Sequence, residues 1–301
     1  MPKPQRWKAY AALTIGVVAI GWSAIFVRWT AMPGLASAFY RVFFATLVLW
    51  PYLLLVRKTR LRVDKRTLLL AGLGGCCFAG DIGLYNIAVL RTSAGSATFL
   101  ANNSPLFVGL LTWAITRRLP TLRFWTALAT ALIGASCIVT IDAQRLGSRS
   151  SADMLAVIAS ACFALYLLFT ERLRQTCDTV TLLALSTAAS ALALLTICTC
   201  MQHTLYTLVI PSVPSLTALL ALSLVSQLTG YLCLTYALGH LPATVTSLIL
   251  LACAPLTAVF ALLVFGERMS MLQLLGGALV LVSVWIVTGE DRTHPALPTM
   301  D

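Results

Sequence analysis

An aspartate lies within an otherwise apolar stretch of the sequence, FAGDIGLYNIAVL at residues 78–90. Cys77, Asp81 and Tyr85 are spaced by four residues, which places them on one face of a helix. A carboxylate in such a helix is costly unless it faces water or a partner, so it indicates a functional site or an internal ion pair. Arg41, in AFYRVFF, is the partner available for an ion pair. We favour a functional role for Asp81 and a structural one for Arg41.

A second polar face lies at the corresponding positions of the second half of the chain. Aligning the two halves places Gln227, Tyr231 and Thr235 over the first polar face. Two such faces at equivalent places predict a shared central cavity. Asn86 lies well round the helix from Asp81 and is not expected to join them.

Each half also carries a proline inside an apolar segment, Pro105 in ANNSPL and Pro255 in LACAPL. A proline has no amide hydrogen, so it leaves the carbonyl four residues earlier without its helical partner and kinks the helix. Paired breaks of this kind point to a central binding site. Asn102 and Asn103 lie beside the first break, where their amides either face a ligand or join helices.

Two aromatic residues in apolar segments, Trp22 and Tyr166, are candidates for the cavity wall, although an aromatic residue in a span more often serves packing or lies at the membrane interface. With these two, the predicted substrate-binding residues are Trp22, Asp81, Tyr85, Asn102, Asn103, Tyr166, Gln227 and Tyr231. Asp81 is also the candidate for proton coupling.

The elements that must position these residues are membrane-spanning helices. The chain is 59% hydrophobic and 10% charged, with a mean hydropathy of +0.90, which is outside the range of soluble domains. A helix needs about 20 apolar residues to cross a membrane. About ten such segments can be marked off, at roughly 9–27, 34–56, 67–90, 93–116, 121–141, 152–170, 179–200, 215–238, 242–265 and 270–288.

The halves form an internal repeat of about five spans each. Leu100, Pro105 and Leu106 correspond to Leu250, Pro255 and Leu256. An odd number of spans per half inserts the second copy upside down, so the predicted fold is an all-α integral membrane protein with two inverted-topology repeats. The expected divisions are a basic cytoplasmic tail at 1–8, repeats at 9–141 and 152–289, a periplasmic linker at 142–151 and a cytoplasmic tail at 290–301.

Most of the 21 Lys and Arg residues fall on one side of this arrangement if the N-terminus is cytoplasmic. The positive-inside rule therefore predicts that both termini are inside. The net charge of +11 is explained by this topology and needs no nucleic-acid partner. The first span follows a basic tail but is longer than a signal-peptide core, so we expect it to be retained.

The sequence gives little indication of an enzyme active site or a metal site. Of the nine cysteines, all but Cys177 fall within predicted spans, and none has metal-ligand spacing with a histidine partner. His203, His240 and His294 lie in loops or the tail, so no acid–base pair is expected at membrane depth. We expect no metal, no cofactor and no catalytic residue.

The sequence resembles the EamA-type permeases of the drug/metabolite transporter superfamily. The resemblance rests on GWSAIFVR in the first span, YR in the second, TSAGSATFLANNSPLFVGLL in the fourth and ATVTSLILLACAPLTAVFALLVFGER in the ninth. It implies ten helices in two inverted repeats, transport of small metabolites such as amino acids, often by export, and a bacterial cytoplasmic membrane. The chain departs from the family's repeat where Gly266-Glu267-Arg268 has no acidic counterpart in Thr116-Arg117-Arg118.

The leading functional hypothesis is a secondary transporter for a small-molecule substrate, working by alternating access in contact with membrane lipids, as a monomer. A broad-specificity efflux pump for cationic drugs is the first alternative, because Asp81 and nearby aromatic residues suit a cation. An integral-membrane enzyme is the remote one. No nucleotide-binding motif is present to indicate ATP as the driving force.

Overall fold

A computed structural model shows that the chain folds into helices, with no strand among the residues it describes. The described residues are 3–56, 63–91, 94–101, 103–117, 119–146, 150–200, 208–266 and 270–288. The first repeat contains α1 (Lys3–Gly21), α2 (Ser23–Trp29), α3 (Gly34–Pro51), η1 (Tyr52–Val56), α4 (Lys65–Val89), α5 (Ala94–Ala101), α6 (Ser104–Thr116) and α7 (Leu122–Leu146). The second contains α8 (Ser150–Leu173), α9 (Thr179–Cys200), α10 (Val213–Ala221), η3 (Leu222–Gly230), α11 (Tyr231–Leu238), α12 (Ala243–Leu250), α13 (Cys253–Phe265) and α14 (Met271–Thr288).

Eight segments within the described residues are long and apolar enough to cross a membrane. They are Arg6–Trp29, Gly34–Leu55, Lys65–Val89, Met154–Leu173, Thr179–Cys200, Val213–Leu238, Ala243–Phe265 and Met271–Thr288. The other two predicted spans, 93–116 and 121–141, are represented there by the shorter apolar helices Ser104–Thr116 and Leu122–Gly134. The chain is therefore a multi-pass helical membrane protein.

Some predicted boundaries differ from the observed ones. The helix α1 begins at Lys3, so much of the expected tail at 1–8 is helical. The helix α7 continues to Leu146 and α8 begins at Ser150, which makes most of the expected linker at 142–151 helical as well. The hydropathy pattern marks where a segment stops being apolar, whereas a helix continues until residues with poor helix propensity end it.

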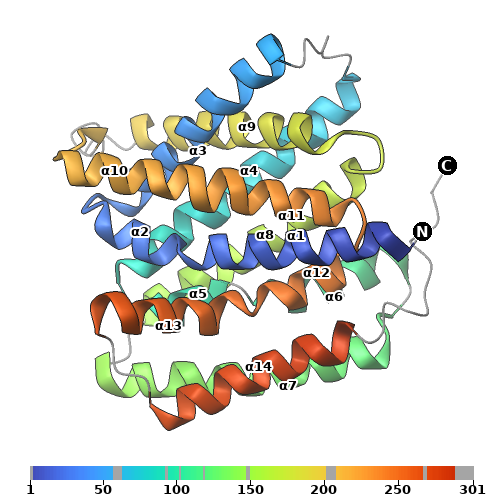
Figure 1. Ribbon diagram of the computed structural model, residues 1–301, viewed down its shortest axis with the longest axis vertical. Coiled ribbons are helices and arrows are strands. Elements are labelled where there is room, and N and C mark those ends of the chain that lie inside the picture. The colour runs from blue at the N-terminus through green and yellow to red at the C-terminus, as the bar shows by residue number, and fades with distance from the viewer. Residues whose placement is uncertain are drawn as a thin grey trace.

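The two repeats pack reciprocally instead of forming separate lobes. The helix α4 of the first repeat packs against α8 of the second, and α1 of the first repeat packs against α11 of the second. The pairs α3 with α9, α5 with α13 and α7 with α14 each join helices from corresponding spans of the two repeats. Figure 1 shows α7 and α14 side by side, and α1 beginning on the side where α14 ends. Neither repeat thus buries its inner faces without the other.

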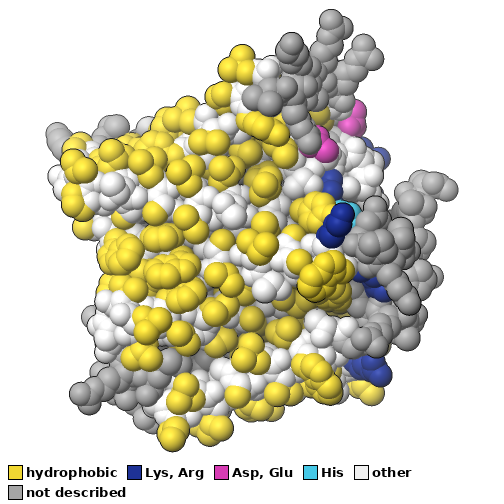
Figure 2. All heavy atoms as spheres, in the orientation of Figure 1, with side chains coloured by type: hydrophobic (Ala, Val, Ile, Leu, Met, Phe, Trp, Pro, Cys, Tyr) yellow, Lys and Arg dark blue, Asp and Glu magenta, His cyan; other side chains and the backbone are white. Residues whose placement is uncertain are grey.

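The surface is apolar over a broad band. Leu263 and Trp285 expose 75% and 77% of their side-chain area, which a soluble domain would not leave open to water alongside so many other apolar residues. On the face shown in Figure 2, hydrophobic side chains are spread across the surface and the basic ones gather at the edge near the start of α1. This distribution fits a lipid-facing belt with charged margins.

Small residues allow the helices to approach closely. A Cβ atom on Gly75 of α4 would lie 2.6 Å from the backbone oxygen of Ser186 and 2.7 Å from the Cβ of Ala189, both on α9. The hydroxyl of Ser190 also donates to the carbonyl of Gly75 at 2.7 Å. Close backbone contact and an interhelical hydrogen bond are the interactions that hold helices together in lipid.

We predict that Gly75→Ala destabilises the protein by about 1–3 kcal/mol, because the added methyl overlaps α9. Gly72 is the matched control on the same helix, since nothing lies within 4 Å of the position of its missing Cβ. Thermal unfolding in detergent should show a lower Tm for Gly75→Ala and an unchanged or higher Tm for Gly72→Ala. Equal Tm values for the two variants would contradict the close packing of α4 on α9.

Candidate functional site

Helices of both repeats are interrupted ahead of a proline. The break between α5 and α6 precedes Pro105, and that between α12 and α13 precedes Pro255. Because Pro255 has no amide hydrogen, the carbonyl of Leu251 accepts a hydrogen bond from the amide of Ala254 instead, at 3.1 Å. The corresponding segments of the two repeats therefore share the same local irregularity.

The first predicted span is also interrupted, at Trp22 between α1 and α2. The ring of Trp22 stacks on Phe260 of α13, with 4.5 Å between centroids, and on Phe26 at 5.7 Å. Tyr85 belongs to the same cluster of side chains, and its hydroxyl lies 3.0 Å from that of Thr98 on α5. Trp22 and Tyr85 are thus brought together beside the broken fourth and ninth spans.

The eighth predicted span contains the π-helical segment η3 between α10 and α11. In a π-helix each carbonyl pairs with the amide five residues on, so the side chains face neighbours that α-helical spacing would not predict. The hydroxyl of Ser226 in η3 donates to the carbonyl of Ala19 on α1 at 2.9 Å. The next residue, Gln227, is fully buried. π-Helical turns inside α-helices are frequent at functional sites.

The centre of the candidate site is Arg41 of α3, whose side chain is 1% exposed. Its Nε donates to Oε1 of Gln227 at 2.9 Å, and its Nη1 donates to the hydroxyl of Ser23 at 2.9 Å. Its guanidinium carbon lies 5.4 Å from the centre of the Tyr231 ring, within range of a cation–π interaction. Arg41 thereby connects α2 and α3 of the first repeat with η3 and α11 of the second.

Asp81 of α4 is buried, with 6% of its area exposed. Its carboxylate and the Arg41 guanidinium interact electrostatically, but they do not form an ion pair within 4.0 Å. Arg41 instead directs hydrogen bonds to Gln227 and Ser23. Arg41 and Asp81 thus place a positive and a negative group in the interior that are not in direct contact.

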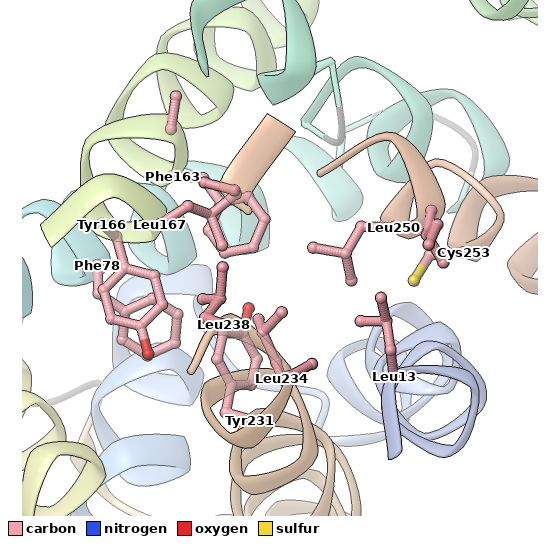
Figure 3. Close-up of a cluster of buried hydrophobic side chains, with 14 of the residues drawn as sticks. Leu13, Phe78, Phe163, Tyr166, Leu167, Tyr231, Leu234, Leu238, Leu250 and Cys253 are labelled. Atoms are coloured by element: carbon pink, nitrogen blue, oxygen red, sulfur yellow. The ribbon is translucent and has the colours of Figure 1, made fainter. Parts of the chain in front are cut away.

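Aromatic rings form one side of this polar cluster. Phe78 stacks on Tyr166 of α8 at 4.7 Å between centroids and lies 4.7 Å from Tyr231, while Tyr166 and Tyr231 are 6.2 Å apart. Phe163 lies 6.0 Å from Tyr166. Figure 3 shows these four rings converging from α4, α8 and α11, with leucines from α11 and other helices beside them. The environment of Arg41 and Asp81 is thus polar at its centre and apolar around it.

The structure brings together most of the residues that the sequence singled out. Gln227 and Tyr231 contact Arg41, and Asp81 interacts with it electrostatically. Tyr166 lies beside Tyr231, whereas Trp22 and Tyr85 belong to the neighbouring cluster. Asn103, at the break before α6, has a buried side-chain oxygen without a hydrogen-bond partner. Asn102 lies outside the described residues.

Other polar residues predicted near this region have structural surroundings. Asn86 is fully buried, and its amide lies 3.0 Å from the hydroxyl of Ser37 on α3, which ties α4 to α3. Cys77 is half-buried and free. Among the described residues no three His, Cys, Asp or Glu side chains group as metal ligands would.

Sequence reasoning left Arg41 and Ser23 out of the predicted site. The sequence predicts Arg41 as a structural partner of Asp81, whereas the structure shows it hydrogen-bonded to Gln227 and Ser23. The available signal is that Arg41 is a cation deep within a predicted span, because ionisable residues at membrane depth mark substrate pathways.

Comparison with known proteins agrees with this architecture. Residues 7–140 and 150–289 each match the EamA-like transporter family. The chain belongs to this family. The resemblance inferred from the sequence is thereby confirmed, and the matched stretches cover both halves of the chain.

Solved structures show the same fold. One of them, described only as a crystal structure of a protein, superposes with a TM-score of 0.74 at 16% identity, over 95% of this chain and 99% of the other. No curated protein matches the chain. The EamA assignment and the apolar helices identify a transmembrane transporter of the drug/metabolite type, and they point to transport in place of catalysis.

We predict that Arg41→Ala lowers the stability of this EamA protein by about 3 kcal/mol or more, because two charged hydrogen bonds are lost and their buried acceptors are left without donors. Arg66, exposed at the start of α4, is the control. Thermal unfolding of purified Arg41→Ala and Arg66→Ala should show a much larger decrease in Tm for the first. Similar Tm values would show that Arg41 contributes nothing to joining the repeats.

Proposed function

We propose that the protein is a secondary transporter that exports small metabolites, such as amino acids or related compounds, by alternating access. In this proposal ten spans form two inverted repeats around a central site. The observation that carries it is the buried hydrogen bond between Arg41 and Gln227, which places charged and amide groups at the junction of the two repeats. Charged residues at membrane depth mark substrate pathways.

The burial of the cluster supports an occluded conformation. Arg41, Gln227 and Tyr166 are each at most 1% exposed, so a solute reaches them only when helices separate on one side. The breaks at Trp22, before Pro105 and before Pro255 supply positions where backbone angles can change. In this mechanism the two repeats rock about the cluster and open it alternately to either side.

We further propose that Asp81 couples transport to protons. The titratable and charged groups around it are Arg41, Tyr85, Cys162, Tyr166 and Tyr231, from α3, α4, α8 and α11. Without direct ion pairing to Arg41, the Asp81 carboxylate is available to gain and lose a proton as the site opens. Acidic residues in such positions act as proton relays in transporters.

We predict that Asp81→Asn abolishes the dependence of transport on an imposed pH gradient in proteoliposomes, because asparagine cannot exchange a proton. Asp178 offers a matched control at the membrane margin, where its carboxylate caps α9 through the amides of Val180 and Thr181. Asp178→Asn keeps an acceptor oxygen and should retain the pH dependence. Intact pH-dependent flux in Asp81→Asn would refute the proton role while leaving the transporter assignment in place.

The alternative of a pump for cationic drugs finds less support. An aromatic ring that would attract a cationic drug, that of Tyr231, already has the Arg41 guanidinium near it. A permanent positive charge beside the aromatic cluster disfavours a second cation there.

We also propose that the protein lies in a bacterial cytoplasmic membrane with both termini inside, as the distribution of Lys and Arg indicates. Fusion of a fluorescent protein to the C-terminus should then give fluorescent cells, whereas a periplasmic phosphatase fused there should be inactive. The reverse pattern would show that the topology is inverted.

A further inference from the structure

Arg41 and Gln227 have hydrogen-bond donors that their mutual contact does not use. A guanidinium carries five N–H donors, and the described residues accept from Nε and Nη1 of Arg41. The amide nitrogen of Gln227, Nε2, is buried and has no hydrogen-bond partner. The site therefore presents donors without matching acceptors.

The orientation of the Gln227 amide is fixed by its partner. Arginine has no acceptor, so the Gln227 atom that receives the Arg41 Nε hydrogen must be the oxygen. The other amide atom is therefore the Nε2 donor. The ring of Tyr231, 5.4 Å from the guanidinium carbon, and the hydroxyl of Ser23 further restrict the position of Arg41.

A buried donor without an acceptor costs about 1–3 kcal/mol, and an acceptor atom of a bound ligand would remove that cost. The ligand that complements it supplies acceptor oxygens and one negative charge. A carboxylate matches the planar fork of an arginine, whereas a phosphate ester with its greater charge would call for further cations. Asp81 nearby also opposes a ligand with two negative charges.

We infer that the Arg41 guanidinium and the Gln227 Nε2 together bind a single carboxylate of the transported substrate. The inference rests on the proposed transporter function and adds the group by which the substrate is recognised. A simple monocarboxylic acid and an amino acid both carry this group. In an amino acid, the ammonium would additionally face Asp81.

The test is transport by purified protein in proteoliposomes loaded with a defined panel, with efflux measured by mass spectrometry. The panel contains the standard amino acids, short monocarboxylates, the amines that correspond to the amino acids without their carboxylate, neutral sugars and nucleosides. Protein-free liposomes provide the background. We expect efflux of members that carry one carboxylate and none of the corresponding amines.

The decisive variant is Gln227→Glu. Glutamate keeps an oxygen to accept from Arg41 Nε but replaces the Nε2 donor with negative charge, so carboxylate efflux should fall by about tenfold to a hundredfold. Gln273→Glu is the matched control. Gln273 accepts from the Ser270 amide at 2.8 Å and Ser270 accepts from the Gln273 amide at 3.2 Å, a capping arrangement that glutamate preserves. Its efflux should equal that of the unmodified protein.

Arg41→Lys is the second variant, for use if Gln227→Glu fails to fold. Lysine retains the charge but not the fork, so the KM for carboxylates should rise at least about tenfold. Efflux of both amino acids and simple acids, or of either alone, supports the inference and distinguishes the two sources of the carboxylate.

The remaining outcomes overturn the inference in distinguishable ways. Efflux of amines, sugars or nucleosides without carboxylates would overturn the carboxylate site and leave the transporter function standing. Carboxylate efflux unchanged in a folded Gln227→Glu or Arg41→Lys protein would do the same. No efflux of any panel member above background would overturn the proposed function itself, and with it the inference.

Discussion

A guanidinium at membrane depth must find its hydrogen-bond acceptors within the protein, because lipid offers none. Arg41 meets this requirement by bonding to Ser23 in its own repeat and to Gln227 in the other. The arrangement of the surrounding helices depends on it, since α2, α3, η3 and α11 must all approach one side chain. A change that separates the repeats also breaks the hydrogen bond from Arg41 to Gln227, which stabilises this buried charge.

The reciprocal packing of the repeats serves the same end. In the pairs α4 with α8 and α1 with α11, a helix of one repeat packs against a helix of the other, so the inner faces of both repeats line one interior. Hydrophobic attraction does little between helices in lipid, and close contacts such as that of Gly75 with α9 take its place. The polar groups in the interior are consequently held by many helices and by no single one.

A transport site in the interior of the protein has to meet two opposing requirements. Buried polar groups must be paired well enough for the fold to be stable, yet a site that is fully paired has nothing to offer a substrate. Arg41 is held by two hydrogen bonds, while the Gln227 amide nitrogen and the Asp81 carboxylate form no hydrogen bond with it. The helices are interrupted near Trp22, Pro105 and Pro255, so these polar groups are held in place without distorting a continuous helix.

The sequence by itself determined the membrane class, the approximate spans, the two-part repeat, the proline breaks and the polar faces that carry Asp81 and Tyr231. These features depend on composition and on the spacing of neighbouring residues, which a helix converts directly into faces. Only the tertiary structure decided that Arg41 bonds to Gln227 and not to Asp81, that Trp22 interrupts the first span and that Gln227 lies in a π-helical segment. Each of these depends on which helix faces meet across the two repeats, and contacts between residues so far apart in the chain leave no local pattern in the sequence.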